Sequence, residues 1–350
     1  MTMPSKADTP SHMWIKDITE KDRIQGSYLV KEKRMGTTRN GKPFISMTLA
    51  DRTGDVEAKV WNRAQELSAL FEQGHILDVE GDAESFRGRI QINISGLKVS
   101  TRQADPGLFL ESAPGDATKE MTTLREILRG VKNDHLKALI QGFLEDKAFL
   151  TQFKKAPAAK RFHHSYVGGL LEHTLSLCKM AAQVAGHYPE LDRDLLVTAA
   201  FLHDIGKTRE LKADLQIDYT DEGRLLGHVV LGAAMVDEKL YHLKDFPQEL
   251  ALRLKHLILS HHGEYEFGSP KRPKFLEAFA LHLIDDLDAK MNGISRFMQK
   301  DRREGDWTEF NRMFERYFIK KEITAPKAAP DEGLRVEERQ GTLFATKMSD

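Results

Sequence analysis

Hydrophobic and polar residues alternate with a period of two between about residues 14 and 101. Residues 45–49 read Ile-Ser-Met-Thr-Leu, and residues 90–94 read Ile-Gln-Ile-Asn-Ile. Such alternation is typical of strands with one buried face, and turn-forming clusters separate the runs. Five strands with a short helix after the third is the order of an OB-fold barrel, which we predict over residues 14–101. The strands are expected at about 23–34, 43–50, 55–61, 75–85 and 89–99, and the helix at 63–71.

Beyond residue 118 the hydrophobic period changes to that of amphipathic helices. Residues 102–118 carry prolines and glycines without periodicity, so they are predicted to be a linker. Thr122 or Thr123, and then Asp134, are predicted to cap the first two helices. Between residues 206 and 225 no helix is expected, although 215–219 suits one arm of a hairpin. We therefore predict a multidomain α+β chain whose all-helical second domain, residues 119–321, has helices at about 122–132, 134–145, 165–186, 191–205, 226–241, 247–261, 273–298 and 307–320.

Length and composition narrow the class of protein. A chain of 350 residues favours two domains, and 52 Lys+Arg against 53 Asp+Glu exclude a globally basic nucleic-acid coat but allow local basic grooves. No apolar run approaches the length of a membrane span, so no membrane partner is expected. The single cysteine, Cys178, excludes an internal disulfide framework and fits a reducing cytoplasm. Residues 1–13 are expected to be a flexible leader and 322–350 a disordered tail.

Histidine is distributed unevenly along the chain. Eleven of the 14 histidines lie between His163 and His282. On the predicted helices, several histidines and two aspartates fall in the apolar stripes that should face the core, as His173 does between Leu170 and Leu177. The inward-facing set is His173, His203, Asp204, His228, His261, His262 and Asp285.

Each of these residues alone is typical of a hydrogen-bonded core histidine or a capping aspartate. Burying so many ionisable groups without partners would be strongly unfavourable, and shared divalent cations remove that cost. Histidine and aspartate without thiolate favour a transition metal over magnesium or calcium, and Cys178 is expected to pack in the core instead. Since seven donors exceed one ion's need, we predict two divalent ions bridged by Asp204, with Mn²⁺ first and Co²⁺, Fe²⁺, Ni²⁺ or Zn²⁺ as alternatives. Such a pair activates water as hydroxide for attack on phosphorus.

The ordered series resembles the HD superfamily of metal-dependent phosphohydrolases, with His203-Asp204 as the signature doublet. With the preceding OB-like segment, which carries Asp-Arg-Thr-Gly at 51–54 and Trp-Asn at 61–62, residues 14–320 resemble the YhaM-type 3′→5′ exoribonucleases. The strings that carry the likeness in the second domain are His-Ser-Tyr-Val-Gly-Gly-Leu-Leu-Glu-His-Thr (164–174), His-Asp-Ile-Gly-Lys (203–207) and Tyr-Thr-Asp-Glu-Gly-Arg-Leu-Leu-Gly-His (219–228).

This resemblance implies an OB domain followed by a helical HD domain, dependence on divalent metal, and release of nucleoside 5′-monophosphates from single-stranded RNA and often single-stranded DNA. It assigns one metal to His173, His203, Asp204 and Asp285, and the other to His228, His261 and His262, with Asp204 shared and catalytic. The register favours Asp285 over Asp286, a choice that residue spacing leaves open.

The sequence differs from related branches of the HD superfamily at two points, and each difference argues against one alternative. Gly169 lies one turn before His173 and offers no carboxylate, which disfavours a third ion. After His262 the chain lacks the Gly-Tyr-Pro motif of cyclic-dinucleotide phosphodiesterases.

Other residues are candidates for substrate contact. Lys207 is close enough to the HD doublet to reach a phosphate oxygen or protonate a leaving group, unless it only interacts with the helix C-terminus. His163 and His164 precede the first ligand helix and are expected to face the substrate or to cap. Basic residues on loops are expected to rim the cleft, unless they are ordinary solvated surface: Arg209, Arg224, Lys271, Arg272 and Lys274.

In the barrel, Phe44 and Trp61 are out of phase with the buried positions of their strands. Exposed aromatic rings on an OB barrel form a platform for base stacking, or else they close the barrel mouth. Basic residues that would follow the phosphates are Lys31, Lys33, Arg34, Arg39, Lys42, Arg87 and Arg89.

We therefore expect a metal-dependent 3′→5′ exoribonuclease, and its sequence permits a homo-oligomer. Two other functions stay open at this point. A phosphohydrolase or phosphodiesterase for small nucleotides would use the same centre, with the barrel serving only assembly. A non-catalytic protein that binds single-stranded nucleic acid would hold structural metal and bind with a steep salt dependence.

Overall fold

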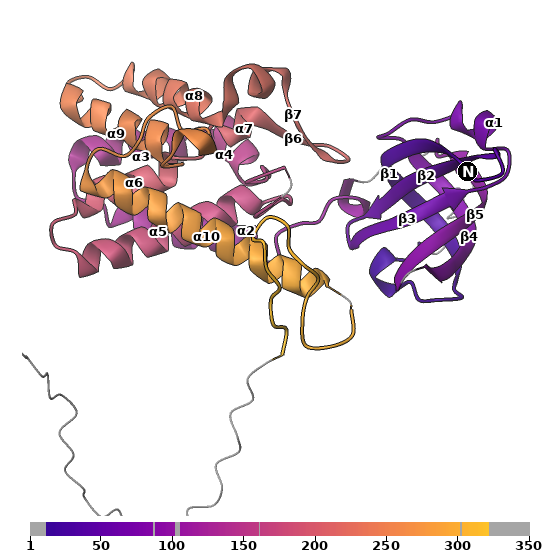
Figure 1. The fold of residues 1–350 in the computed structure, drawn as a ribbon. Coiled ribbons are helices and arrows are strands. Elements are labelled where there is room, and N and C mark those ends of the chain that lie inside the picture. Colours follow the sequence, from indigo (N-terminus) through magenta and orange to yellow (C-terminus); the bar gives the residue numbers. More distant parts are fainter. Residues whose placement is uncertain (1–11, 87, 102–105, 161, 302, 322–350) are drawn as a thin grey trace, which may run out of the picture. The chain divides into compact units, whose positions relative to one another are not determined.

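A computed structural model describes residues 12–86, 88–101, 106–160, 162–301 and 303–321 (Figure 1). Both predicted folds are confirmed: a five-stranded OB barrel is followed by a helical HD domain. Across the described ranges, no helix is long and apolar enough to cross a membrane. Residues outside the description include Arg87, most of the predicted leader (1–11), four linker residues (102–105) and the predicted tail (322–350).

The barrel closes through a parallel pairing between its third and fifth strands. Alternation along the strands places Ile45 and Leu49 in the core, while Ser46 and Thr48 between them are only partly buried. A short helix, α1 (Ala64–Ser68), follows the third strand as predicted. The strand order is β1-β2-β3-β5-β4, with β1 (Arg23–Thr37), β2 (Pro43–Asp51), β3 (Gly54–Val60), β4 (Ile76–Phe86) and β5 (Arg89–Val99).

A buried carboxylate fastens the segment before the barrel. The side chain of Asp51 accepts hydrogen bonds from the backbone of Ile15, from the backbone and hydroxyl of Thr53, and from the His12 ring at 3.2 Å. Ile15 begins the short 3-10 helix η1 (Ile15–Asp17) and packs in the barrel core. The turn after β2 is therefore structural.

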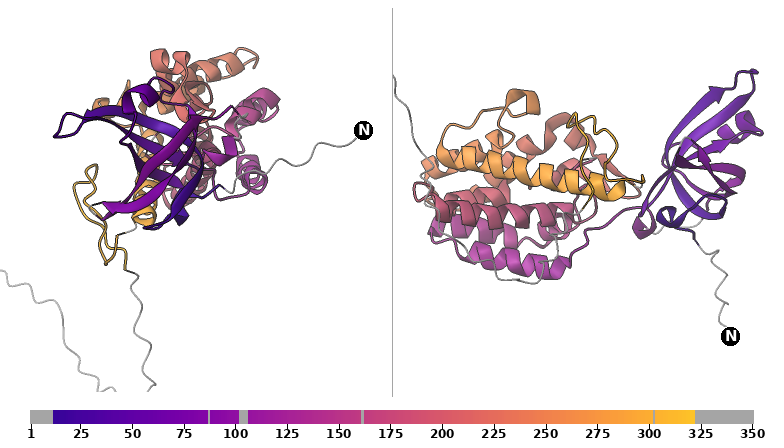
Figure 2. Two further views of the ribbon diagram at one scale, coloured as in Figure 1. Left: turned by 90° about the vertical axis from the view of Figure 1, so that its right-hand side faces the viewer. Right: turned by 60° about the horizontal axis from the view of Figure 1, so that its bottom comes forward.

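The second domain packs its helices around one apolar core, which includes the buried rings of Phe143, Phe153 and Phe201. Figure 2 shows these helices in two further views. A short hairpin, β6 (Leu211–Ala213) and β7 (Ile217–Tyr219), separates the seventh and eighth helices. The helices are α2 (Ala117–Arg129), α3 (Asp134–Leu144), α4 (Lys147–Phe153), α5 (Gly169–His187), α6 (Arg193–Leu202), α7 (Lys207–Glu210), α8 (Asp221–Leu240), α9 (Gln248–Ser260) and α10 (Leu276–Lys300).

Helix starts differ from the prediction. Asp116 caps α2, which begins five residues earlier than expected, because its carboxylate accepts from the backbone of Thr118 and Lys119. Thr122 and Thr123 are therefore not caps: their hydroxyls donate to carbonyls one turn back. Asn133, not Asp134, caps α3. Helix α4 was not predicted.

Two further segments correct the prediction. The stretch from 206 to 225 does contain helix, because α7 follows the HD doublet and α8 begins at Asp221 behind the capping hydroxyl of Thr220. The hairpin arm expected at 215–219 is confirmed as β7.

Residues 307–320 are not helical. This segment belongs to a separate compact unit that begins at Met298. Bridges join Trp307 to Ile319 and Asn311 to Arg316, and the Asn311 side chain accepts backbone N–H groups at 313 and 314. Such side-chain-to-backbone bonds compete with helix formation.

Candidate metal centre

Five helices bring the predicted ligand residues to one place in the second domain. His173 lies on α5, His203 and Asp204 directly follow α6, and His228 lies on α8. The remaining three are His261 and His262, which follow α9, and Asp285 on α10. His173 and His203 are 0% exposed and Asp204 is 2% exposed, so the centre is set deep in the domain.

The first cluster surrounds one oxygen of Asp204. The Nε2 atoms of His173 and His203 lie 3.2 Å apart, and Asp204 Oδ2 is 3.6 Å and 3.2 Å from them, respectively. Asp285 Oδ1 lies 3.1 Å from His173 Nε2. Four donor groups thus point at one small volume, and His173, His203 and Asp204 meet the spacing of a metal-binding group.

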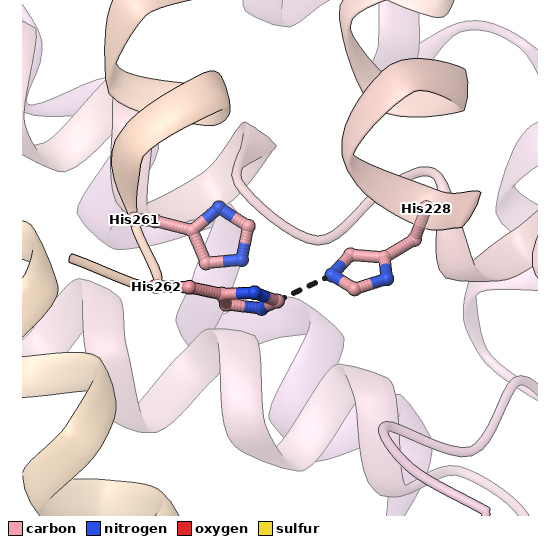
Figure 3. Close-up of side chains that lie close together, drawn as sticks. All are labelled: His228, His261 and His262. Carbon is pink, nitrogen blue, oxygen red and sulfur yellow. Dashed lines mark hydrogen bonds between the residues drawn. The ribbon is translucent and has the colours of Figure 1, made fainter. Parts of the chain in front are cut away.

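The second cluster faces the other oxygen of the same carboxylate. His228 Nε2 and His261 Nε2 lie 3.5 Å and 3.6 Å from Asp204 Oδ1. His262 completes the group, with its Nε2 3.3 Å from that of His228 (Figure 3). Asp204 therefore lies between two groups of nitrogen donors, one at each carboxylate oxygen.

Buried atoms in this centre lack ordinary partners. Within the part of the chain that the structure describes, Asp204 Oδ1 and His261 Nε2 have no hydrogen-bond partner, although both are fully buried. Leaving such groups unsatisfied is unfavourable, and a cation among them would satisfy the carboxylate oxygen and the nitrogen together. The residues present fit a divalent metal, because imidazole nitrogens and carboxylate oxygens are its common ligands.

Four of the five ligand histidines have the opposite ring nitrogen held by an acceptor. The exception is His262, whose Nδ1 has no hydrogen-bond partner among the described residues. His173 Nδ1 lies 2.7 Å from Asp288 Oδ2, and His228 Nδ1 lies 3.1 Å from Glu210 Oε1. In the other two rings, His203 Nδ1 and His261 Nδ1 meet the backbone carbonyls of residues 200 and 258. An acceptor at Nδ1 keeps the proton there and leaves Nε2 free to bind metal.

Two glycines allow the segments that carry the ligand residues to lie close together. Gly227 has φ +73°, which breaks α8 just before His228 and lets the His228 backbone N–H donate to Glu210 as well. A side chain at Gly206 would overlap the carbonyl of His228, so only glycine fits between the doublet and α8.

The surroundings favour the metal-binding protonation state at Asp204 and His262, but the protonated form at His173. Burial alone would raise the pKa of Asp204, but the Lys207 ammonium, whose Nζ is 2.5 Å away, and His203 hold it well below its ordinary value. Burial, with His228 beside it, lowers the pKa of His262 to about 4. For His173, the hydrogen bonds that its ring donates to Asp285 and Asp288 outweigh burial and raise the pKa to about 9, so binding a cation there releases a proton.

The two histidines before α5 lie differently from one another. The His163 ring is 5.3 Å from that of His173, and burial, followed by the charge of Lys207, lowers its pKa to about 3. His164 is buried, and its ring nitrogens meet the Tyr166 hydroxyl and Asp288 at 3.0 Å and 2.9 Å. Both ring nitrogens of His164 are therefore engaged behind His173, and a contact between His164 and substrate stays a prediction.

Most of the predicted basic rim is already paired. Arg209 makes a bidentate ion pair with Glu238, and Arg224 and Arg272 pair with Asp218 and Glu264. Lys271 and Lys274 are exposed. Of the two aspartates left open, Asp285 reaches the centre, whereas Asp286 pairs with Lys290 at the surface.

In the barrel, the predicted aromatic pair forms one surface. The rings of Phe44 and Trp61 lie 5.0 Å apart at 31°, and Lys59 Nζ is 5.5 Å from the Phe44 ring. Trp61 donates to Asn93 Oδ1 on β5 at 3.0 Å and is 46% exposed. Arg39 and Lys42 are exposed on the loop between β1 and β2. We name Phe44, Lys59, Trp61 and Asn93 the aromatic face.

Two family models match the chain. Residues 29–100 match an OB-fold nucleic acid binding domain, and residues 170–290 match the HD domain. The HD match spans the cluster residues from His173 to Asp285 and agrees with a centre that holds divalent metal.

The chain also resembles curated proteins over most of its length. The 3′-5′ exoribonuclease YhaM of Bacillus subtilis is 36% identical over 290 residues, covering 82% of this chain and 91% of that protein. The chain belongs to the YhaM 3′-5′ exoribonuclease family. Members of that name from Geobacillus sp. and Halalkalibacterium halodurans are 37% and 34% identical, covering 82% and 87% of this chain and 88% and 95% of their own lengths. The family resemblance read from the motifs is thus confirmed.

Two residues that orient the ligand rings, Asp288 and Glu210, were not predicted from the sequence. The role of Asp288 could have been predicted, because it follows Asp285 by about one helical turn and so lies on the same face of the helix. No sequence pattern indicated the role of Glu210, since its contact with His228 depends on the break in α8 at Gly227.

Proposed function

We propose that this YhaM-family chain is a metal-dependent 3′→5′ exoribonuclease, a hydrolase that cuts the terminal phosphodiester bond of single-stranded RNA and releases nucleoside 5′-monophosphates. The observation that carries the proposal is the position of Asp204, whose two oxygens face two separate groups of donors. Two divalent ions held by these donor groups would supply an activated water and stabilise charge on the phosphate oxygens.

The ligand roles belong to the same proposal. His173, His203, Asp204 and Asp285 would hold one ion, and His228, His261 and His262 would hold the other together with Asp204. Manganese is the first choice, with cobalt, iron, nickel or zinc as alternatives. A cytoplasmic location, single-stranded DNA as a further substrate and a homo-oligomer are also proposed.

Lys207 is proposed to act at the centre itself. Its ammonium is buried, with its Nζ beside Asp204 Oδ2. Its positive charge also contributes to lowering the pKa of His163 and of His262. From there it can stabilise the oxygens of the reacting phosphate or donate a proton to the leaving oxygen. His163, which is half-buried with its ring 5.3 Å from that of His173, is proposed to contact the terminal nucleotide.

The aromatic face of the barrel is proposed to bind single-stranded nucleic acid. Every base has an apolar face that stacks on an aromatic ring, so Phe44 and Trp61 would bind without strong sequence preference. Lys59, with Arg39 and Lys42, would neutralise phosphates.

Replacing the HD doublet tests the proposal. With a 5′-end-labelled RNA and manganese, the wild-type chain should yield a ladder shortened from the 3′ end and mononucleotides. His203→Ala and Asp204→Ala should abolish hydrolysis while leaving RNA affinity nearly unchanged, because the barrel supplies the binding. Turnover by both variants after metal removal, or internal fragments from the wild type, would refute the proposal. Hydrolysis of a small phosphodiester but not of RNA would favour a small-nucleotide phosphodiesterase.

A further inference from the structure

The string of residues 164–174 contains three polar side chains that are not metal ligands, and they form a linked group behind His173. The Tyr166 hydroxyl lies 3.0 Å from His164 Nδ1 and donates to Glu172 Oε2 at 2.6 Å. His164 and Tyr166 are both buried. Buried polar groups that are connected in this way fix one another's positions. The string therefore supplies the centre with more than the one ligand that it carries.

The other ring nitrogen of His164 reaches the carboxylate that orients His173. His164 Nε2 donates to Asp288 Oδ2 at 2.9 Å, and His173 Nδ1 donates to the same oxygen at 2.7 Å. The Ser176 hydroxyl donates to the other oxygen of Asp288. Because an ionised carboxylate only accepts hydrogen bonds, donors at both of its oxygens fix its orientation. His164 thus holds Asp288 where the His173 ring needs it.

The backbone of His164 is held in a conformation that residues with a side chain rarely adopt. Its φ is +44°, in the left-handed region. Its N–H donates to Asn292 Oδ1 at 2.9 Å, and its carbonyl accepts from the backbone of Ala158 and Tyr166. A Cβ at Gly169 would lie 2.0 Å from this carbonyl oxygen, so only glycine fits there. Such a conformation persists where the surroundings impose it, and it is typical of functional sites.

One face of α10 carries the partners of both histidines. Asp285, Asp288 and Asn292 are spaced by three and four residues and so lie on the same side of the helix. Asp285 Oδ1 lies 3.1 Å from the metal-facing nitrogen of His173, whereas Asp288 binds the opposite nitrogen. Asn292 binds the His164 backbone. His164 and the ligand ring are therefore positioned against one rigid element.

We propose that His164 is a positioning residue of the metal centre, which acts on His173 through the carboxylate of Asp288. The inference rests on the proposed function, because the ion at His173 belongs to that function. It gives His164 a role in metal binding that does not require RNA and that is confined to the His173 cluster.

Titrating metal-free, full-length protein with Mn²⁺ in a calorimeter tests the proposal. The binding step that Asp288→Asn weakens identifies the His173 cluster. His164→Ala should weaken the same step by about 10-fold, the lower end of the usual effect of an outer contact, and leave the His228 step unchanged. His187→Ala, at an exposed histidine on the same helix as His173, is the control and should bind as the wild type does.

A matched pair of variants separates the hydrogen bond from the fold. His164→Asn tolerates the positive φ but is too short to reach Asp288, so it should lose as much affinity as His164→Ala. His164→Gln carries an amide N–H that can reach Asp288, and it should recover most of the loss. If His164→Ala does not fold, this pair gives the same comparison. Equal affinity in the Asn and Gln variants would overturn the proposal.

Double variants show whether His164 acts through Asp288. Adding His164→Ala to Asp288→Asn should weaken Mn²⁺ binding no further, because residues that act through one contact are not additive. Adding it to Glu210→Gln should weaken both steps. Additive losses with Asp288→Asn, or unchanged Mn²⁺ affinity with a raised KM for RNA, would overturn the inference and leave the exonuclease proposal standing. A wild type that binds no Mn²⁺ would overturn both.

Discussion

Two carboxylates outside the metal centre, those of Asp288 and Glu210, orient histidine rings that point into it. Asp288 holds His173 and Glu210 holds His228, so each cluster has one histidine oriented by a charged group and another oriented by a backbone carbonyl. Such outer contacts fix the ring and the tautomer, and a carboxylate also makes the imidazole more basic. The clusters should therefore respond separately when one carboxylate is neutralised.

Neutralising Glu210 should weaken one metal position only. Glu210→Gln should lower affinity at the His228 cluster by about 10- to 100-fold, the usual effect of losing such a contact, and Asp288→Asn should do so at the His173 cluster. Calorimetric titration of metal-free protein with Mn²⁺ measures both. Glu222→Gln and Asp286→Asn, at exposed carboxylates, are the matched controls. Equal loss at both positions in either variant would contradict separate orientation.

Asp51 should stabilise the barrel in a pH-dependent way. Burial alone would raise its pKa, but hydrogen bonds from His12, Thr53 and Ile15 outweigh burial and lower it. A carboxylate whose pKa is lowered by folding stabilises the fold above its unfolded value, and the effect is lost as the pH falls through the folded value. Asp51→Asn should cost about 1–3 kcal/mol of unfolding free energy at neutral pH. In urea unfolding, the difference from wild type should shrink below about pH 4; a difference that grows there would contradict this.

At the scale of elements, hydrophobic periodicity predicted the five strands and the helices that carry the ligand residues. Each of these elements buries one face, and burial of one face imposes a regular spacing of apolar residues. Short helices and the residues at which helices begin were harder to predict from the sequence. Helix α4 has only seven residues, and α2 begins at a cap within the presumed linker. Residues 307–320 share apolar spacing with a helix, yet Thr308 and Asn311 bind the backbone instead. The inward set of histidines was predictable for the same reason as the helices, whereas Glu210 depends on a single glycine break.

The aromatic face, which draws on β2, β3, β5 and the residue after β3, is proposed to bind nucleic acid, and removing its rings tests that role. Phe44→Ala and Trp61→Ala should each weaken binding of a single-stranded oligonucleotide by about 1–3 kcal/mol, the effect of removing one stacking ring. Fluorescence anisotropy measures this, and Leu70→Ala, at an exposed leucine elsewhere in the barrel domain, is the control. Hydrolysis of a small phosphodiester should not change. Unaltered affinity in both aromatic variants would show that the rings serve another purpose.

For the whole molecule, we propose that the barrel and the helical domain contribute to the same reaction. The barrel offers rings and cations suited to any single strand, and the helical domain offers a buried centre suited to phosphate chemistry. Both depend on segments distant in sequence, since the centre alone draws on residues from His173 to Asp285. The central proposal is that Asp204 would hold two ions, one at each of its carboxylate oxygens.

Anomalous diffraction from crystals soaked in Mn²⁺ tests that claim most directly. We expect two peaks per chain, roughly 3.5–4 Å apart, one at each oxygen of Asp204. Peaks at the His173 side and the His228 side should both weaken in Asp204→Asn crystals. A single peak, or manganese bound away from this carboxylate, would contradict the account.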